Sequence, residues 1–152
     1  MSPETRIQEL HLTLPPAPKP VAVYKPAVQL GNVLYVSGHG PLLPDGTLIL
    51  GKVGAELSLE QGQQAARQVG LAILSTVRAT LGSLDKVKRL VKTLGMVNCP
   101  VDYKDHPKVI NGFSELMADV FGKENGIGAR SAVGMGSLPN NMAVEIECIF
   151  EV

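Results

Sequence analysis

Hydrophobic residues occupy every second position along residues 142–152, and the charged residues of this segment stand between them. An extended strand points successive side chains to opposite faces, so this period of two predicts a strand with one buried face. The buried face would carry Met142, Val144, Ile146, Cys148, Phe150 and Val152. The opposite face would carry Ala143, Glu145, Glu147, Ile149 and Glu151. Three further stretches rich in β-branched and other apolar residues predict strands at residues 33–37, 87–97 and 130–138.

Two segments show the spacing of amphipathic helices instead. Ser58 is followed three residues later by Gln61, which is the pattern of a capping box, and apolar positions then recur at helical spacing as far as Leu81. Gly82 follows at the place of a C-terminal cap. In the second segment, Pro107 fits the first turn of a helix. The apolar residues of that helix form one stripe: Val109, Phe113, Leu116, Met117 and Val120.

Proline and glycine residues mark the connections between these elements. The prolines within residues 1–20 lack a backbone N–H and favour extended backbone, so this segment predicts an arm that leads into a single domain at residues 21–152. Residues 21–25 predict a first short strand. Turn-forming residues at positions 45–46 predict a small hairpin, and those at 139–141 predict a turn. Three glycines within residues 122–128 predict a flexible loop.

The order of these elements predicts an α+β fold, in which two helices cover one face of a mostly antiparallel sheet. The other face of the sheet must then meet water or another chain. If the last two strands pair as a hairpin through residues 139–141, Glu145 lies opposite the middle of the preceding strand. Arg130, at the start of that strand, would instead face the C-terminal end of the last strand. A site that uses both residues therefore need not lie within one subunit.

The charge balance limits the choice of partners. Fourteen Lys and Arg residues stand against fourteen Asp and Glu residues, so the formal net charge is zero and the chain exerts no global attraction on RNA or DNA. A hydrophobic content of 45% with 18% charged residues excludes a disordered chain. The positive mean hydropathy of +0.15 indicates that some apolar surface meets a partner subunit.

The sequence lacks the signatures of membrane-spanning, secreted and metal-binding proteins. No apolar run approaches the roughly 18 residues of a membrane span, and residues 1–20 carry charges in place of the apolar core of a signal peptide. We therefore expect a cytoplasmic protein with no membrane partner, in which Cys99 and Cys148 are reduced. The three histidines, His11, His39 and His106, stand apart from one another along the chain, so we expect no metal site.

Two positions are the strongest candidates for chemistry. Arg130 stands where a glycine-rich segment meets a strand, and its planar guanidinium suits bidentate binding of a carboxylate; pairing with a nearby surface acid is the alternative. Glu145 and Glu147 share one face of the last strand, where their repulsion can raise one pKa toward the range useful for proton transfer. A solvated strand face is the alternative for this pair. Weaker candidates, for which a structural or surface role is the alternative, are Tyr24, Asn111 and His39.

The C-terminal part of the chain resembles the signature of the Rid family, the reactive intermediate imine deaminases, also described as YjgF or L-PSP endoribonuclease-like proteins. The residues that carry the resemblance are Ala129-Arg130-Ser131, Leu138-Pro139 and Val144-Glu145-Ile146. Supporting residues elsewhere are Tyr24, Gly31-Asn32, Ser37-Gly38, Val87-Lys88, Asn111 and the long helix from Ser58. The resemblance extends over residues 21–152.

This resemblance implies a chorismate-mutase-like fold that forms a homotrimer, with the sheets closed into a central barrel and three clefts between subunits. It also implies that Arg130 holds the carboxylate of a substrate and that Glu145 orients a water molecule. No cofactor or metal is implied, because an imine carbon is already electrophilic. The expected substrate-binding residues are Tyr24, Asn111, Ser37, Gly38 and His39.

Three functions are compatible with these observations. The leading hypothesis is hydrolytic deamination of small 2-imino or enamine acids to 2-oxo acids and ammonia. The first alternative is a non-catalytic protein that binds or senses small carboxylates. The second is an endoribonuclease or translation inhibitor, as the family name suggests. The zero net charge, the small number of aromatic residues and the lack of a catalytic His pair argue against RNA, for which the basic run at residues 86–92 is the sole candidate patch.

Overall fold

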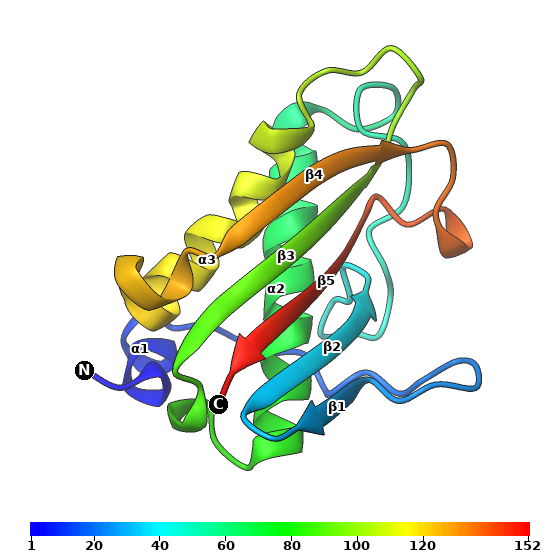
Figure 1. Ribbon diagram of the computed structural model, residues 1–152. Coiled ribbons are helices and arrows are strands. Elements are labelled where there is room, and N and C mark those ends of the chain that lie inside the picture. Colours follow the sequence, from blue (N-terminus) through cyan, green and yellow to red (C-terminus); the bar gives the residue numbers. More distant parts are fainter.

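The computed structural model describes residues 1–152 as a five-stranded sheet covered on one face by helices (Figure 1). The strand order is β1-β2-β5-β3-β4, and every neighbouring pair is antiparallel except β3 and β4. The predicted α+β class is confirmed. The strands are Ala27–Leu30 (β1), Val33–His39 (β2), Arg89–Asn98 (β3), Ala129–Met135 (β4) and Val144–Glu151 (β5).

The long helix α2 (Leu59–Leu81) begins and ends at the predicted caps. The Ser58 hydroxyl accepts a hydrogen bond from the Gln61 backbone N–H at 3.1 Å, and the Gln61 side chain accepts one from the Ser58 N–H at 2.8 Å. These two bonds satisfy backbone donors that a helix start leaves unpaired. Gly82 ends the helix with a φ of +84°, a left-handed conformation that glycine adopts without strain. Two single-turn 3-10 helices occur elsewhere, at Leu84–Lys86 and Pro139–Asn141.

The second long helix, α3 (His106–Gly126), has Pro107 in its first turn, as predicted, but it continues further than expected. Gly122 interrupts the helix with a φ of +82°, after which the chain makes one more helical turn before β4. The flexible loop predicted for residues 122–128 is therefore wrong. A single glycine can redirect a helix while the residues that follow it return to helical backbone.

The hairpin considered for the last two strands is not formed. β4 pairs with β3, in parallel, whereas β5 lies between β2 and β3. A parallel pair needs a crossover connection, and α3 supplies it by returning the chain to the end of the sheet where β3 begins. Residues 136–143 then carry the chain past the end of β3 into the centre of the sheet. A turn signal at residues 139–141 cannot by itself distinguish this path from a hairpin.

The N-terminal segment differs from the sequence-based expectation in two ways. Residues 21–24 form bends and Lys25 is irregular, in place of the strand predicted for residues 21–25, and β1 begins only after Pro26. The first residues form a short helix, α1 (Pro3–Glu9), whose Ile7 belongs to the hydrophobic core. The Glu4 carboxylate fixes α1 to the domain by accepting hydrogen bonds from Arg78 Nη2 at 2.6 Å and from the Leu84 backbone N–H at 2.9 Å.

The core lies between the sheet and the two long helices. Val144, Ile146, Cys148 and Phe150 of β5 are all buried on the helix side, which confirms the alternation seen in the sequence. The residues between them face the opposite side of the sheet and are partly or fully exposed. Burial of alternate residues thus fixes which side chains of β5 are available for function.

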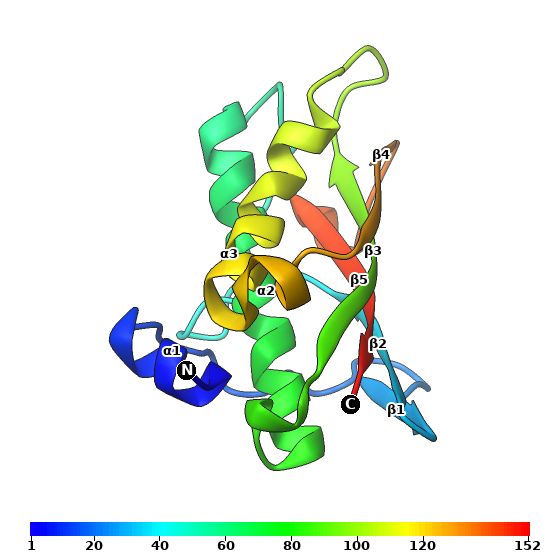
Figure 2. The ribbon, with the colours of Figure 1, turned by 60° about the vertical axis from the view of Figure 1, so that its left-hand side comes forward.

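The face of the sheet opposite the helices is uncovered (Figure 2). Apolar side chains on this face remain exposed, among them Val28 (51%), Leu30 (70%) and Tyr35 (47%). A contiguous apolar surface of this kind is typical of a protein interface. The homotrimeric barrel remains a prediction. No helix in the structure is both long enough and apolar enough to cross a membrane.

The packing of α2 against α3 gives a direct test of the fold. A Cβ atom at Gly112 would lie 2.1 Å from the backbone oxygen of Gln63, so the two helices would have to move apart. Gly112→Ala is therefore expected to destabilise the protein by about 2 kcal/mol or more, although alanine favours helix by about 1 kcal/mol. Urea denaturation measures this change. Gly136→Ala is the control, because no atom lies within 4 Å of its added Cβ; an equal effect of the two variants would contradict this packing.

Candidate functional site

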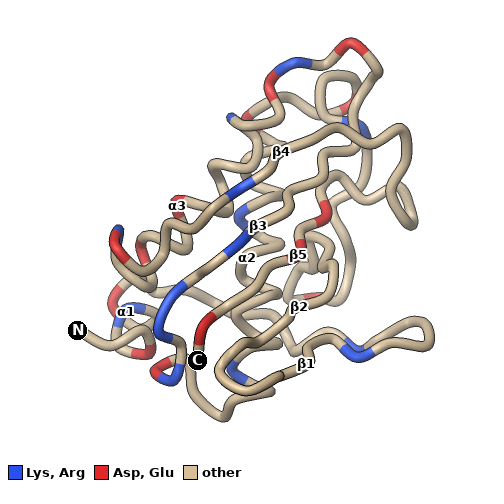
Figure 3. The backbone as a smooth tube through the Cα atoms, viewed as in Figure 1, with Lys and Arg blue, Asp and Glu red and all other residues tan.

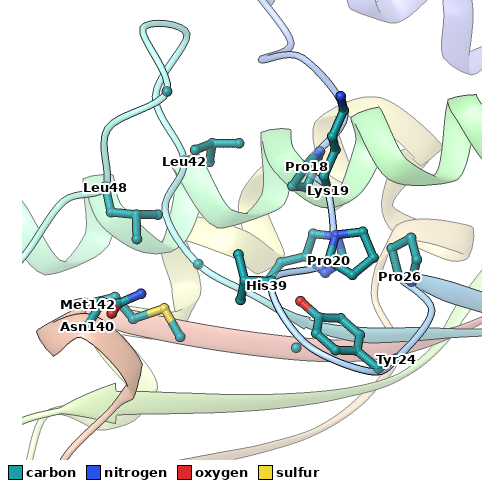
Figure 4. Close-up of a pocket in the computed structure, with 14 residues that line it drawn as sticks. Pro18, Lys19, Pro20, Tyr24, Pro26, His39, Leu42, Leu48, Asn140 and Met142 are labelled. Carbon is teal, nitrogen blue, oxygen red and sulfur yellow. The ribbon is translucent and has the colours of Figure 1, made fainter.

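The structure divides the predicted site residues into two groups. Tyr24, Gly38 and His39 line one pocket, of about 290 Å³, between the segment before β1 and the end of β2 (Figure 4). Arg130 and Asn111 line a second pocket, of about 490 Å³, between β4 and α3. Each pocket therefore holds only part of the predicted constellation.

Glu145 lies beside the first group. It is on β5 next to the end of β2, where the register shifts between Val36 and His39. Gly38 makes room for its side chain, because a Cβ atom at this position would overlap the Glu145 carboxylate. Burial, and then the negative charge of Glu147, raise the pKa of Glu145. The direction is the one expected from the paired carboxylates, but burial makes the larger contribution.

Arg130 is held by α3. Its Nη1 donates hydrogen bonds to Asn111 Oδ1 at 2.9 Å and to Ser114 Oγ at 3.1 Å, and its Nη2 donates to the Pro107 carbonyl at 3.4 Å. The guanidinium forms no ion pair within the chain, so the alternative of a surface acid as its partner does not apply. Its Nε–H and a second Nη2–H have no partner in the chain and can receive an anion.

Ser114 is a positioning residue that the sequence reasoning missed. It lies three residues after Asn111, and residues at this spacing occupy the same face of a helix. Its role could have been inferred from that spacing once Asn111 was singled out. The Asn111 side chain itself acts here by holding the guanidinium, with its oxygen as the acceptor.

Arg130 and Glu145 do not meet within one chain. Arg130 lies opposite Thr93 on β3, whereas Glu145 lies opposite Met96, three residues further along the same strand. Arg130 also points toward the helices, and Glu145 points to the uncovered face. Two strand spacings and three residues along the strand place their backbones about 14 Å apart.

Ser37 and His39 have internal partners. The Ser37 hydroxyl donates to the Lys25 carbonyl at 2.6 Å and so fixes the segment before β1. His39 Nδ1–H donates to the Ser37 carbonyl at 2.6 Å, and Nε2 accepts from the Thr76 hydroxyl on α2 at 2.8 Å. Burial lowers the pKa of His39 and favours the neutral ring. Contact of these two residues with substrate stays a prediction, as it does for Tyr24, whose hydroxyl has no partner within the chain.

The structure contains no group of three His, Cys, Asp or Glu side chains that could hold a metal ion. Both cysteines are free thiols. What the two pockets offer is a cation with unused donors in one and a half-buried carboxylate beside the other.

Comparison with known proteins identifies the family. A family model described as "YjgF/chorismate mutase-like, putative endoribonuclease" matches residues 4–150. The chain is 40% identical to Protein TCP17 of Trypanosoma cruzi over 96% of its own length and 91% of that protein. It is 28% identical to the 2-iminobutanoate/2-iminopropanoate deaminase of Dermatophagoides farinae, over 91% of this chain and 92% of that one.

A solved structure from Shewanella oneidensis, titled a "putative endoribonuclease", superposes with a TM-score of 0.95. The two chains are 27% identical and each is covered completely. The fold and these matches show that the protein belongs to the YjgF/chorismate-mutase-like family, which confirms the resemblance to Rid proteins.

The raised pKa of Glu145 predicts how stability depends on pH. Between the ordinary value of 4.5 and the raised value, the folded state binds more protons than the unfolded state, so stability falls as pH rises through this window. Glu145→Gln removes the charge and is expected to raise the melting temperature at neutral pH. This gain should vanish at and below about pH 4.5.

Thermal unfolding followed from about pH 4 to about pH 8 measures the difference between wild type and variant. Glu124→Gln, at an exposed position of α3, is the control for the removal of one carboxylate and is measured at the same pH values. If the difference in melting temperature between wild type and Glu145→Gln does not change with pH, or if the variant is less stable at neutral pH, the raised pKa of Glu145 is contradicted.

Proposed function

We propose that the protein forms a homotrimer that hydrolyses small 2-imino or enamine acids to 2-oxo acids and ammonia at sites between subunits. The observation that carries this proposal is the state of Arg130. Its guanidinium is oriented by Asn111 and Ser114, has no acidic partner, and keeps donors free for a carboxylate. The deaminase activity named for the Dermatophagoides farinae relative supports the choice of reaction.

Assembly between subunits would unite the two groups of residues. β4 is an edge strand, so Arg130 lies at the rim of the sheet and can reach a neighbouring molecule. The uncovered apolar face provides the surface that such an assembly would bury. A head-to-tail contact that closes on itself would place each Arg130 near the Glu145 of a neighbour and repeat the site three times.

The proposed reaction requires mainly that the substrate and a water molecule are held in position. Arg130 would bind the substrate carboxylate through two charge-assisted hydrogen bonds. Glu145 of the neighbouring subunit would accept a proton from a water molecule as its oxygen attacks the imine carbon. The tetrahedral product then releases ammonia, whose nitrogen takes up the proton, and a carbonyl forms. A carboxylate whose pKa is raised by burial is a stronger base in the first step, and it then retains the proton until the leaving nitrogen takes it up in the second.

RNA cleavage is less well supported by the charges. Basic residues lie along β3 and on β4 (Figure 3). Most of these side chains are already engaged within the chain. Arg89 pairs with Glu151 at 2.8 Å, Lys88 donates to the Val152 carbonyl at 3.0 Å, and Lys92 donates to Ser131 Oγ at 3.3 Å. A polyanion would have to displace these contacts.

Loss of the carboxylate anchor should lower catalytic efficiency. Arg130→Gln is expected to reduce kcat/KM by about 10- to 100-fold, since a charge-assisted hydrogen bond contributes about 1.5–3 kcal/mol. The assay supplies a 2-imino acid from an L-amino-acid oxidase and follows the appearance of the 2-oxo acid. Lys108→Gln, which removes an exposed ion pair with Asp105, is the control and should leave the rate unchanged. Ligand-induced thermal stabilisation by a 2-oxo acid without any turnover would favour the non-catalytic binding function instead.

Mixing two variants of low activity tests whether the site is shared. Arg130→Gln and Glu145→Gln subunits are unfolded together, refolded and assayed. If each site takes Arg130 from one subunit and Glu145 from the next, random trimers regain about a quarter of the wild-type activity. If both residues act within one chain, the mixture stays as inactive as its components, and the shared site is excluded.

A further inference from the structure

A third pocket, distinct from the two described above, opens where the carboxyl ends of β3 and β4 meet the start of α3. It has a volume of about 400 Å³. The ends of β3 and β4 beside it are at the top of the sheet in Figure 1. Crevices outside the carboxyl ends of parallel strands are common ligand sites in proteins with crossover helices. The lining residues are Lys52, Cys99, Pro100, Val101, His106, Gly134, Met135 and Gly136.

A cysteine and a histidine form a pair in this pocket. Cys99 Sγ lies 3.5 Å from His106 Nε2, within the range of a sulfur hydrogen bond. The rings of Tyr103 and His106 pack nearly perpendicular to each other, with 5.4 Å between the centroids and an interplanar angle of 86°. Gly134 leaves space for the pair, since a Cβ atom there would lie 2.9 Å from Sγ and 2.5 Å from Nε2. The two side chains are therefore held together by their surroundings.

The same pocket contains a cation that lacks a carboxylate partner. Lys52 Nζ donates to Asn98 Oδ1 at 3.1 Å and to the Gly136 carbonyl at 2.8 Å, and it belongs to no ion pair. An ammonium group has three N–H donors, so one remains for a ligand. The buried Asn98 is held in turn by Asn141, which accepts from its amide at 3.0 Å. An anion that enters the pocket thus meets a fixed positive charge.

We propose that Cys99 is a nucleophilic thiol, with His106 as its base and Lys52 as its anion-binding group, for a small electrophile that carries a carboxylate. A nucleophile within hydrogen-bonding distance of a base is the arrangement that covalent catalysis requires. This site is separate from Arg130 and Glu145, and it does not depend on the proposed deaminase activity.

The reaction at this site balances without a further reactant. The thiol proton passes to His106 Nε2 while the sulfur forms a bond to the electrophilic carbon. With a leaving group on that carbon, the group departs with its electron pair. With an activated double bond, the electron pair moves to the adjacent carbon, which then takes the proton from His106. Burial raises the pKa of Cys99, so the thiol is protonated at rest and its reactivity requires the base.

The second cysteine is an internal control. Cys148 lies on the helix-facing side of β5 within the hydrophobic core and has no base beside it. Both thiols have little exposed surface, but only Cys99 lines this pocket, so a difference in their rates reports the surroundings of Cys99, including the access of the reagent.

Alkylation with two reagents tests the proposal. Iodoacetate and iodoacetamide share a leaving group, but only iodoacetate is anionic. In the folded wild-type protein, we expect iodoacetate to modify Cys99 about tenfold faster than Cys148, as measured by peptide mass spectrometry over time. The ratio of the iodoacetate rate to the iodoacetamide rate should also be higher at Cys99 than at the thiol of free glutathione. Equal rates at the two cysteines, or a ratio no higher than that of glutathione, would overturn the proposal.

Three variants assign the roles of the neighbouring residues. His106→Gln should slow the reaction of Cys99 with both reagents by about fivefold or more. Lys52→Met should lower the ratio of iodoacetate to iodoacetamide rates, whereas Lys52→Arg, which keeps the charge, should preserve it. An unchanged rate in His106→Gln or an unchanged ratio in Lys52→Met would contradict the assigned role. The wild-type comparison with glutathione decides the proposal even where a variant fails to fold. Activity toward 2-imino acids is measured in parallel, and its absence would leave the result at Cys99 unaffected.

Discussion

The burial of every second residue of β5 is the constraint on which the arrangement of the molecule depends. β5 is the central strand, and α2 and α3 cover only one of its faces. Its apolar residues must face the helices, so Glu145 and Glu147 must lie on the uncovered side. Arg130 is on β4, the edge strand next to β3, and α3 holds its side chain on the helix side of the sheet. The same packing that makes the core therefore separates the cation from the carboxylate and makes the proposed reaction depend on a second subunit.

Local sequence patterns predicted the elements well, but not how they are joined. The capping box at Ser58, the glycine cap at Gly82 and the alternation along β5 depend on residues close in sequence, and all three were confirmed. The position of β4 depends instead on the length of α3 and on residues 136–143 passing over β3, which no local pattern encodes. Gly122 was mistaken for the start of a loop because a positive φ can equally redirect a helix.

For the candidate site too, the sequence identified individual residues but not which of them lie together. Arg130 and Glu145 could be singled out by residue type and position, and the Glu145 pKa moved in the expected direction. Ser114 was missed because a serine inside an amphipathic helix is usually unremarkable in sequence. Cys99 and His106 are separated by a loop of six residues with no motif spacing, so only the path of the loop between β3 and α3 in the structure shows that they meet. One helix thus serves two pockets, with His106 at its start and Asn111 and Ser114 further along.

The central place of β5 also has a consequence for synthesis on the ribosome. β5 is the last strand in the sequence, yet it separates β2 from β3, and both of these strands pair with it along most of their length. Until residues 144–151 leave the exit tunnel, the two halves of the sheet have no strand to join them, and α2 lacks the strand β5 against which it packs. The domain must therefore remain open until residues 144–151 emerge, and it then closes in one late, non-local step.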